Sequence, residues 1–303
     1  MMYDVIIIGS GPAGLTAGIY TARANLKTLI IAGTTWGGQL MLTSVIENFP
    51  GFARGIDGPV LMQQMREQAE HHGVQIKDVP AVAIEGTKSP FTVKTETESF
   101  QAKAVIIASG ADARWLGVPG EKERSGKGMS SCATCDAAFF RGKEVIIVGG
   151  GDSAMEEALV LAQVASKVTI IHRRDSFRAS QIMQDKVHAH EKIEVKFNSE
   201  IIEVKGEGRV QSAIVKDTQS GQTSEMAVNG IFVAIGHIPN TKFLSGLDVD
   251  TQGYLVVKEK MQTSIEGIVT AGDVHDTHYR QAITAAGFGC QAALEVEKWL
   301  HMQ

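Results

Sequence analysis

Cysteine, an excess of positive charge and long apolar runs are all missing or scarce in this 303-residue chain. Three cysteines are too few to cross-link a secreted scaffold of this size, so the sequence favours a reducing, cytoplasmic setting. No apolar stretch approaches the roughly 20 residues that span a bilayer, and the N-terminus lacks the features of a signal peptide. A net charge of -5 does not indicate binding to nucleic acid or to an anionic membrane surface.

What is present is a globular composition, 44% hydrophobic and 21% charged, in a chain long enough for about two domains. One pattern occurs twice: an apolar strand, a glycine turn, a helix-like stretch and a second apolar strand. The first copy has its strands at residues 3–8 and 28–31, and the second at residues 144–148 and 168–171. Each copy is typical of a dinucleotide-binding βαβ unit, and the matched pair predicts two dinucleotides on one chain.

Two β-rich stretches accompany these units. Residues 80–101 alternate apolar and polar side chains around turn formers, which predicts a small antiparallel meander leading to a buried strand at 103–108. Residues 193–235 form a second β-rich stretch, interrupted by glycines.

The C-terminal part of the chain completes the first unit. We expect a strand at 267–271 and an apolar-patterned helix from about 279 to 300. Crossings between domains are expected at 112–117 and 238–243, where short polar residues interrupt the pattern. The second unit would therefore be inserted into the first.

The first glycine turn has the spacing that a pyrophosphate requires. Gly9 allows the tight turn, Gly11 the close approach of the ligand, and Gly14 the packing of helix on strand. The alternative is a glycine-rich turn without a ligand. The acid that often binds the ribose is absent because Ala32 occupies its place, so ribose recognition needs the threonines at 34–35 or the backbone.

The second unit carries a basic cluster after its second strand. His172, Arg173, Arg174 and Arg178 stand where an NAD-selective enzyme has an acid. The planar guanidinium pairs with phosphate oxygens, so the cluster indicates the 2′-phosphate of NADPH. A solvated basic surface turn is the alternative. The nearby acid Asp175 argues against a phosphate site.

Cys132 and Cys135 form a CxxC pair at the start of a predicted helix. Such a pair can close a small disulfide, and the helix N-terminus favours the nucleophilic thiolate. Half of a zinc site and an inert buried pair are the alternatives. Zinc would need two further ligands, whereas Cys290 lies in a distant core-patterned helix and the histidines at 275–278 lie in a separate turn.

Asp136 directly follows the second cysteine of the pair. A carboxyl group there could act as general acid or base in thiol–disulfide exchange if burial raises its pKa. It could equally serve only to stabilise the N-terminus of the helix, where acids are favoured. The sequence leaves both roles open.

The ordered motifs GSGPAG, GGQL, ENFPG, CATCD, GGGDSAMEEA, HRRDSFRAS, GHIPN and AGDV…YRQA resemble low-molecular-weight thioredoxin reductases over essentially the whole chain. These are FAD/NADPH pyridine nucleotide-disulfide oxidoreductases. The resemblance implies an α/β fold of two Rossmann-like domains, each with a small antiparallel β-meander. An NADPH domain at 114–241, carrying the CxxC, would be inserted into an FAD domain at 1–113 and 242–303. A cytoplasmic homodimer acting on thioredoxin, without a metal, is implied as well.

The resemblance also implies roles for single residues. Cys135 would be the sulfur near the flavin, Cys132 the sulfur that attacks thioredoxin, and Asp136 the acid. FAD would be held by Gly9, Gly11, Pro12, Ala13, Gly14, Gly37, Gly38, Gln39, Asn48, Gly272, Asp273, Arg280, Gln281 and Ala282. NADPH would be held by Gly149, Gly151, Asp152, Ser153, His172, Arg173, Arg174 and Arg178.

Two features qualify this interpretation. Ala137 stands where the family commonly has glycine, which leaves the backbone after Asp136 open. The disulfide and the nicotinamide would both need the same flavin neighbourhood, so the resemblance implies that one domain rotates about the two crossing segments. Rival hypotheses are a reductase fed by ferredoxin, a ferredoxin–NADP reductase-like flavoenzyme, and a non-enzymatic NADPH or zinc-binding regulator. The first would not need the arginines and the second would lack the CxxC.

Overall fold

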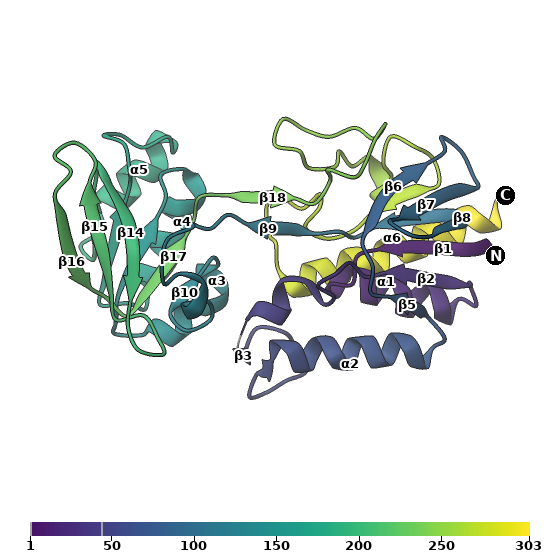
Figure 1. The fold of residues 1–303 in the computed structure, drawn as a ribbon, viewed down its shortest axis with the longest axis horizontal. Coiled ribbons are helices and arrows are strands. Elements are labelled where there is room, and N and C mark those ends of the chain that lie inside the picture. Colours follow the sequence, from purple (N-terminus) through teal and green to yellow (C-terminus); the bar gives the residue numbers. More distant parts are fainter. Residues whose placement is uncertain (1, 44) are drawn as a thin grey trace. The chain divides into compact units, whose positions relative to one another are not determined.

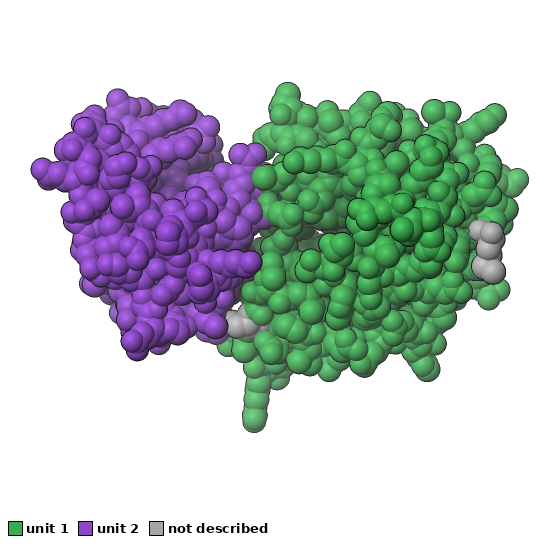
Figure 2. All heavy atoms as spheres, viewed as in Figure 1, with its two compact units in different colours: residues 1–112, 238–303 green, residues 113–237 purple. Residues whose placement is uncertain are grey.

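The chain folds as two compact units in a computed structural model that describes residues 2–43 and 45–303 (Figure 2). Unit 1 comprises residues 1–112 and 238–303, and unit 2, residues 113–237, is inserted into it. The chain crosses between them through β9 (Ala111–Ala113) and β18 (His237–Pro239), two strands that pair with each other. The predicted α/β fold with an inserted domain is confirmed.

Unit 1 is built on a seven-stranded sheet (Figure 1). Its parallel part runs through β5 (Gln75–Lys77), β2 (Thr28–Ile31), β1 (Met2–Ile8) and β8 (Ser99–Ile107), and β19 (Ile268–Thr270) pairs with the end of β8. The antiparallel part adds β7 (Phe91–Thr95) and β6 (Ala81–Glu85). A separate hairpin pairs β3 (Val45–Ile46) with β4 (Ile56–Asp57).

The predicted separation between the meander and the buried strand at 103–108 is wrong. Both belong to β8, whose residues 99–102 pair with β7 and whose residues 105–107 pair with β19. Exposure alternates along the first part of this strand, whereas residues 104–107 are buried on both faces. One continuous strand therefore looked like two because its surroundings change along its length.

Alternate residues of β1 contribute to two different cores, because side chains along a strand point to opposite faces. Val5 and Ile7 pack with the helices α1 (Pro12–Arg23), α2 (Gly58–His71) and α6 (Ala282–His301). Ile6 and Ile8 pack with β6, β7 and apolar residues between 243 and 274. Burial of each such aliphatic side chain contributes roughly 1.5–3 kcal/mol of stability, so β1 anchors the glycine turn that follows it.

Unit 2 repeats the plan with a five-stranded parallel sheet. Its order is β10 (Met129–Ser130), β17 (Gly230–Val233), β11 (Glu144–Val148), β12 (Lys167–Ile171) and β13 (Ile193–Lys196). The helices α3 (Ala133–Asp136), α4 (Asp152–Ala162) and α5 (Gln181–His188) accompany it. A three-stranded antiparallel sheet packs on its other face: β14 (Ser199–Lys205), β15 (Ser212–Asp217) and β16 (Thr223–Ala227).

The second predicted β-rich stretch, 193–235, is divided between these two sheets. Residues 193–196 and 230–233 pair in parallel within the main sheet, and only residues 199–227 form the antiparallel meander. Which strand pairs with which depends on long-range register, and local patterning does not carry that information.

The C-terminal helix α6 begins at Ala282, three residues later than predicted. The backbone N–H groups of residues 278–280 donate to the side chain of Asp276, and Gln281 caps the helix in a reciprocal bond with Thr284. Within residues 2–43 and 45–303, no helix combines the length and apolar character that crossing a bilayer requires.

Candidate functional site

Cys132 and Cys135 are joined by a disulfide in unit 2, with their Cα atoms 5.3 Å apart. Cys132 is the N-cap of α3, and its Sγ accepts a hydrogen bond from the backbone N–H of Cys135 at 3.2 Å. Cys135 is exposed and Cys132 is half-buried. Because the two sulfurs are bonded to each other, the pair has the form of a redox disulfide rather than of two zinc ligands.

Asp136 ends the same short helix and is held by Ser130. Its Oδ2 accepts a hydrogen bond from Ser130 Oγ at 2.6 Å, and its backbone N–H donates to the carbonyl of Cys132 at 3.2 Å. Burial raises the pKa of the Asp136 carboxyl, and the bond from Ser130 partly offsets this rise. Asp136 therefore meets the condition set for a general acid, a raised pKa beside the sulfurs.

Ser130 is a site residue that the sequence analysis missed. Its side chain is buried, and its Oγ also accepts the backbone N–H of Cys132 at 3.1 Å. The available signal was a serine two residues before the first cysteine, where a hydroxyl can bond the backbone locally. Ala137 has ordinary right-handed dihedrals, φ -54° and ψ -35°, so the position commonly held by glycine does not need one here.

The first glycine turn, residues 9–14, joins β1 to α1 in unit 1. Gly9 has φ 109°, and a side chain there would collide with the Ala108 carbonyl, so only glycine fits. The space at Gly11, the N-cap of α1, is open where a phosphate would approach. Ser10 Oγ donates to the Ala32 carbonyl at 2.9 Å and accepts the N–H of Gly37 at 3.0 Å, which brings the GGQL loop to this turn.

Asp273 follows β19 and has an unsatisfied side chain. Its Oδ1 is buried and has no hydrogen-bond partner among the described residues. Burial raises the pKa of Asp273 to about 6, and the nearby charge of Asp276 adds to the rise. A buried carboxyl oxygen without a partner fits a ligand hydroxyl group, such as those of a ribityl chain.

Arg280 lies near this carboxyl in an unusual conformation, with φ 49°. Asp276 sets that conformation by accepting the N–H groups of residues 278–280, each at 2.9 Å. The Arg280 guanidinium lies over the ring of Tyr254, 5.6 Å from its centroid.

Asn48 Nδ2 donates to Gln281 Oε1 at 3.3 Å, so two segments predicted to line the flavin meet. Asp276 and Tyr254 were not identified from the sequence.

The second glycine turn, residues 149–151, joins β11 to α4 in unit 2. The ring of His172 occupies the space that a side chain at Gly150 would need. His172 is buried, its Nε2 has no partner among the described residues, and burial lowers its pKa. His172 is therefore neutral near pH 7, and its ring centroid lies 5.6 Å from that of Phe177, with the two rings tilted by 39°.

The three arginines lie beside this turn. Arg173, Arg174 and Arg178 are exposed, and none forms an ion pair with a carboxylate in the part of the chain that the structure describes. The backbone N–H of Arg178 donates to the Gly150 carbonyl at 2.8 Å, which brings the cluster to the turn. Asp175, the acid that argued against a phosphate site, is exposed, and its Oδ1 accepts a hydrogen bond from Ser176 Oγ.

The remaining predicted residues flank these features. Gln39 Nε2 donates to Asp112 Oδ1 at 2.7 Å, and Gly272 has φ 78° directly before Asp273. Pro12, Ala13, Asp152, Ser153 and Ala282 lie in the first turns of α1, α4 and α6. The structure thus brings the predicted residues together in three places, while their assignment to FAD and NADPH stays a prediction.

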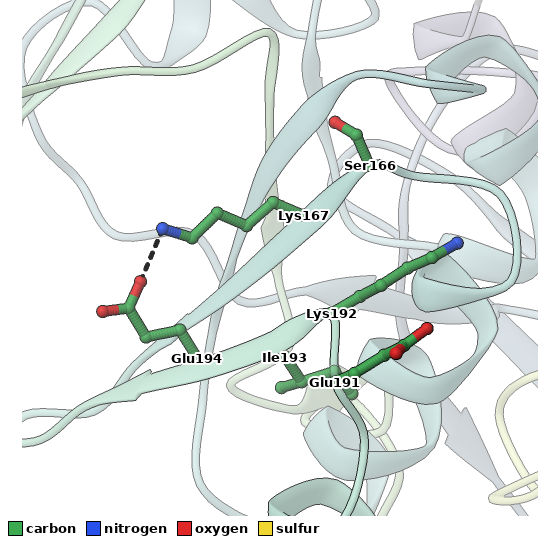
Figure 3. A pocket seen from close by; sticks show the side chains of 6 residues that line it. All are labelled: Ser166, Lys167, Glu191, Lys192, Ile193 and Glu194. Atoms are coloured by element: carbon green, nitrogen blue, oxygen red, sulfur yellow. Dashed lines mark ion pairs between the residues drawn. The ribbon is translucent and has the colours of Figure 1, made fainter.

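A shallow pocket of about 300 Å³ lies elsewhere in unit 2 (Figure 3). It is at the amino ends of β12 and β13, and Lys167 pairs across it with Glu194 at 2.7 Å. Its lining residues are Ser166, Lys167, Glu191, Lys192, Ile193 and Glu194. Nucleotides bind parallel α/β sheets at the carboxyl ends of the strands, so we assign this pocket no part in cofactor binding.

Comparisons with known proteins agree with this geometry. A family model described as pyridine nucleotide-disulphide oxidoreductase matches residues 3–289. A thioredoxin reductase from Mycolicibacterium smegmatis is 51% identical over 306 residues, covering 100% of this chain and 98% of that protein. The crystal structure of thioredoxin reductase from Streptococcus pyogenes MGAS5005 has a TM-score of 0.96 at 42% identity, covering 100% of this chain and 99% of that one.

One relative carries a different name. A protein from Pseudomonas fluorescens, 47% identical over 304 residues and covering 98% of this chain and 95% of that protein, is named glucosaminate ammonia-lyase. Overall similarity therefore does not replace the chemistry of the site as the argument for a particular reaction.

Proposed function

This chain belongs to the pyridine nucleotide-disulphide oxidoreductase family, and from that premise we propose that it reduces the disulfide of oxidised thioredoxin. It is an NADPH-dependent flavoprotein oxidoreductase whose cofactors are FAD and NADPH. One observation carries the proposal: the Cys132–Cys135 disulfide shares one helical turn with Asp136, a carboxyl group whose pKa is raised by burial.

The proposed FAD domain, residues 1–113 and 242–303, corresponds to unit 1, residues 1–112 and 238–303. The open approach at Gly11 suits a pyrophosphate, and the unsatisfied Oδ1 of Asp273 suits a hydroxyl of the ribityl chain. We assign Arg280, Gln281 and the loop at 37–39 to the flavin side. When bound, FAD would supply the redox chemistry that links a hydride from NADPH to the two electrons that the disulfide needs.

The proposed NADPH domain, residues 114–241, corresponds to unit 2, residues 113–237. The second glycine turn faces the N-terminus of α4, where backbone N–H groups can receive the pyrophosphate. Arg173, Arg174 and Arg178 are not engaged by described carboxylates and can pair with the 2′-phosphate. The unsatisfied Nε2 of His172 offers one more polar atom at this place.

The sulfur chemistry follows from the geometry of α3. Reduction of the disulfide takes two electrons and two protons and yields two thiols. The N–H of Cys135 points at Cys132 Sγ, so negative charge on Cys132 is stabilised at the helix N-cap. Asp136 provides a proton to a newly formed thiolate, and its carboxylate form takes one back.

Cys132 is the proposed nucleophile toward thioredoxin. Its thiolate attacks one sulfur of the thioredoxin disulfide, forms a mixed disulfide and expels the other sulfur, which takes up a proton. The Cys135 thiolate then attacks Cys132, which restores the Cys132–Cys135 disulfide and releases the second thioredoxin thiol. Each cycle therefore returns the enzyme to the form that the structure describes.

We further propose a cytoplasmic homodimer in which the segments 112–117 and 238–243 act as hinges between the units. A reducing compartment supplies NADPH and keeps thioredoxin in turnover. Light scattering of the purified holoenzyme should give twice the 32.5 kDa chain mass. A mass equal to one chain would reject the dimer and leave the sulfur chemistry untouched.

The function is tested by following NADPH oxidation by the flavin-loaded enzyme with oxidised thioredoxin, and with a glutaredoxin as control substrate. We expect rapid, thioredoxin-dependent oxidation. Ammonia release from glucosaminate, measured in parallel, tests the other name found among the relatives. Ammonia release without thioredoxin reduction would overturn the proposal.

A further inference from the structure

The loop that carries the arginines, residues 173–180, is attached to the second glycine turn and to the start of α4 by three successive backbone N–H groups. Those of Arg178 and Ala179 donate to the Gly150 carbonyl at 2.8 and 3.2 Å. The N–H of Ser180 donates to Asp152 Oδ1 at 2.9 Å, and Ser180 Oγ donates to the same oxygen at 2.8 Å. The two bonds to Gly150 involve its backbone carbonyl, whereas the two bonds from Ser180 are accepted by a side chain, that of Asp152.

Asp152 occupies a position where direct contact between its carboxylate and a phosphate of the ligand would be unfavourable. It is the first residue of α4, the helix whose N-terminus faces the proposed pyrophosphate. A carboxylate there gains from the helix dipole but would repel a phosphate group. Its Oδ1 is instead engaged by Ser180, and these bonds lower the pKa of Asp152, which keeps it ionised.

The Ser180 side chain also bonds Asp152 rather than its own helix. It is the N-cap of α5, yet its side chain makes no capping bond to that helix. An N-cap serine usually bonds the helix it begins. Here the hydroxyl bonds Asp152, 28 residues earlier in the chain.

We propose that Asp152 is a positioning residue for NADPH specificity: through Ser180 it fixes the arginine loop relative to the second glycine turn. A ligand with both a pyrophosphate and a 2′-phosphate then meets two sites already at the correct separation, which lowers the cost of binding both. NAD⁺ and NADH lack the 2′-phosphate and gain nothing from the position of the loop. This inference rests on the proposed function, since it assigns NADPH to unit 2.

The test measures equilibrium binding to the oxidised holoenzyme with three probes. NADP⁺ spans both sites, adenosine 2′-monophosphate reaches only the arginines, and NAD⁺ reaches only the glycine turn. In Asp152→Ala the affinity for NADP⁺ should fall about tenfold, and in Ser180→Ala about threefold, as expected for lost hydrogen bonds to a charged group. The other two probes should change by less than about twofold in both variants.

Two controls separate positioning from folding. Asp152→Asn keeps the oxygen that accepts from Ser180, so it should restore NADP⁺ affinity close to that of the native enzyme. Ser176→Ala removes an exposed hydroxyl of the same loop that bonds only its neighbour Asp175 among the described residues, and should bind all probes normally. In steady state, Asp152→Ala should raise KM for NADPH at unchanged kcat, with no change for NADH.

Three results would overturn the inference: no loss of NADP⁺ affinity in Asp152→Ala, an equal loss for NAD⁺, or an Asp152→Asn variant as weak as Asp152→Ala. A different result tests the proposed function. If the native holoenzyme binds NADP⁺ no more tightly than NAD⁺, the NADPH assignment itself fails before any variant is compared.

Discussion

The hydroxyl of Ser130 bridges Asp136 and Cys132. It donates to Asp136 Oδ2 at 2.6 Å and accepts the backbone N–H of Cys132 at 3.1 Å. Ser130 closes β10 with only 7% of its surface exposed, so the bridge is built on the parallel sheet. The acid is therefore held against the turn that carries the sulfurs, and two opposing influences, burial and this bond, set its pKa.

Ser130→Ala should shift the pH profile of thioredoxin reduction. The hydrogen bond stabilises the carboxylate, so its loss raises the pKa of Asp136 further. The limb of the kcat profile that reports Asp136 should therefore move to higher pH. Ser130→Thr keeps the hydroxyl and should retain the native profile, whereas an unshifted limb in Ser130→Ala would contradict this account.

Cys135→Ser should separate the two halves of the reaction. NADPH should still reduce the bound flavin, because the hydride step does not need the disulfide. Thioredoxin turnover should fall by a factor of at least about a thousand, because the sulfur that regenerates the disulfide is gone. Stopped-flow spectra of the flavin and steady-state turnover measure the two steps. The matched control is Cys290→Ser, a free cysteine on α6, which should leave both rates native.

Asp273→Asn should stabilise the flavin-free protein and weaken FAD binding. The pKa of Asp273 is about 6 in the folded chain against 3.8 in the unfolded one, so the folded state binds more protons between these values. Stability therefore falls as pH rises from about 4 to 6, and ~3 kcal/mol is lost above that range. Asparagine carries no charge, and the substitution should remove this loss.

The measurement is the melting temperature of the FAD-depleted protein at about pH 5 and about pH 8, on either side of the folded pKa. Relative to Asp273→Asn, the native chain should lose stability at the higher pH. The lowered pKa of His275, about 4, adds a rise in stability with pH that is common to both proteins, so the difference between them reports Asp273. Asp248→Asn, an exposed aspartate of the same unit, serves as the control. Equal pH dependence in all three proteins would show that folding does not raise the pKa of Asp273.

Removing two arginines should abolish the preference for NADPH. We expect the native enzyme to favour NADPH over NADH by well over a factor of ~10 in kcat/KM, since each guanidinium–phosphate contact is charge-assisted. The double variant Arg173→Ala, Arg174→Ala should lose most of this preference through KM for NADPH, with NADH kinetics unchanged. Arg209→Ala, at an exposed arginine of the same unit, removes one positive charge elsewhere and should keep the preference. A retained preference in the double variant would place the 2′-phosphate away from this loop.

Much of the candidate site was accessible from local sequence. The CxxC turn, the glycine turns and the arginine loop each depend on residues close together in the chain. The backbone conformation of such a turn permits only certain residue types. Gly9 illustrates this, because its left-handed conformation and its contact with Ala108 admit no side chain. The β-strand that continues from residue 99 to 107 was missed because its surroundings change along its length. Its first part pairs with β7, which directly precedes it, and its last part pairs with β19, which comes from a distant segment.

The sequence by itself determined the chemistry of this protein: two dinucleotide turns, a pair of adjacent sulfurs, an acid beside them and a basic loop. Each is a short-range pattern whose steric and electrostatic requirements can be read from a few neighbouring residues. Only the tertiary structure decided how these groups are tuned. The Ser130 bond to Asp136, the burial of Asp273, and the contact between Asp152 and Ser180 all depend on packing that brings separate segments together, and burial and hydrogen bonding, which set pKa values, are properties of that packing.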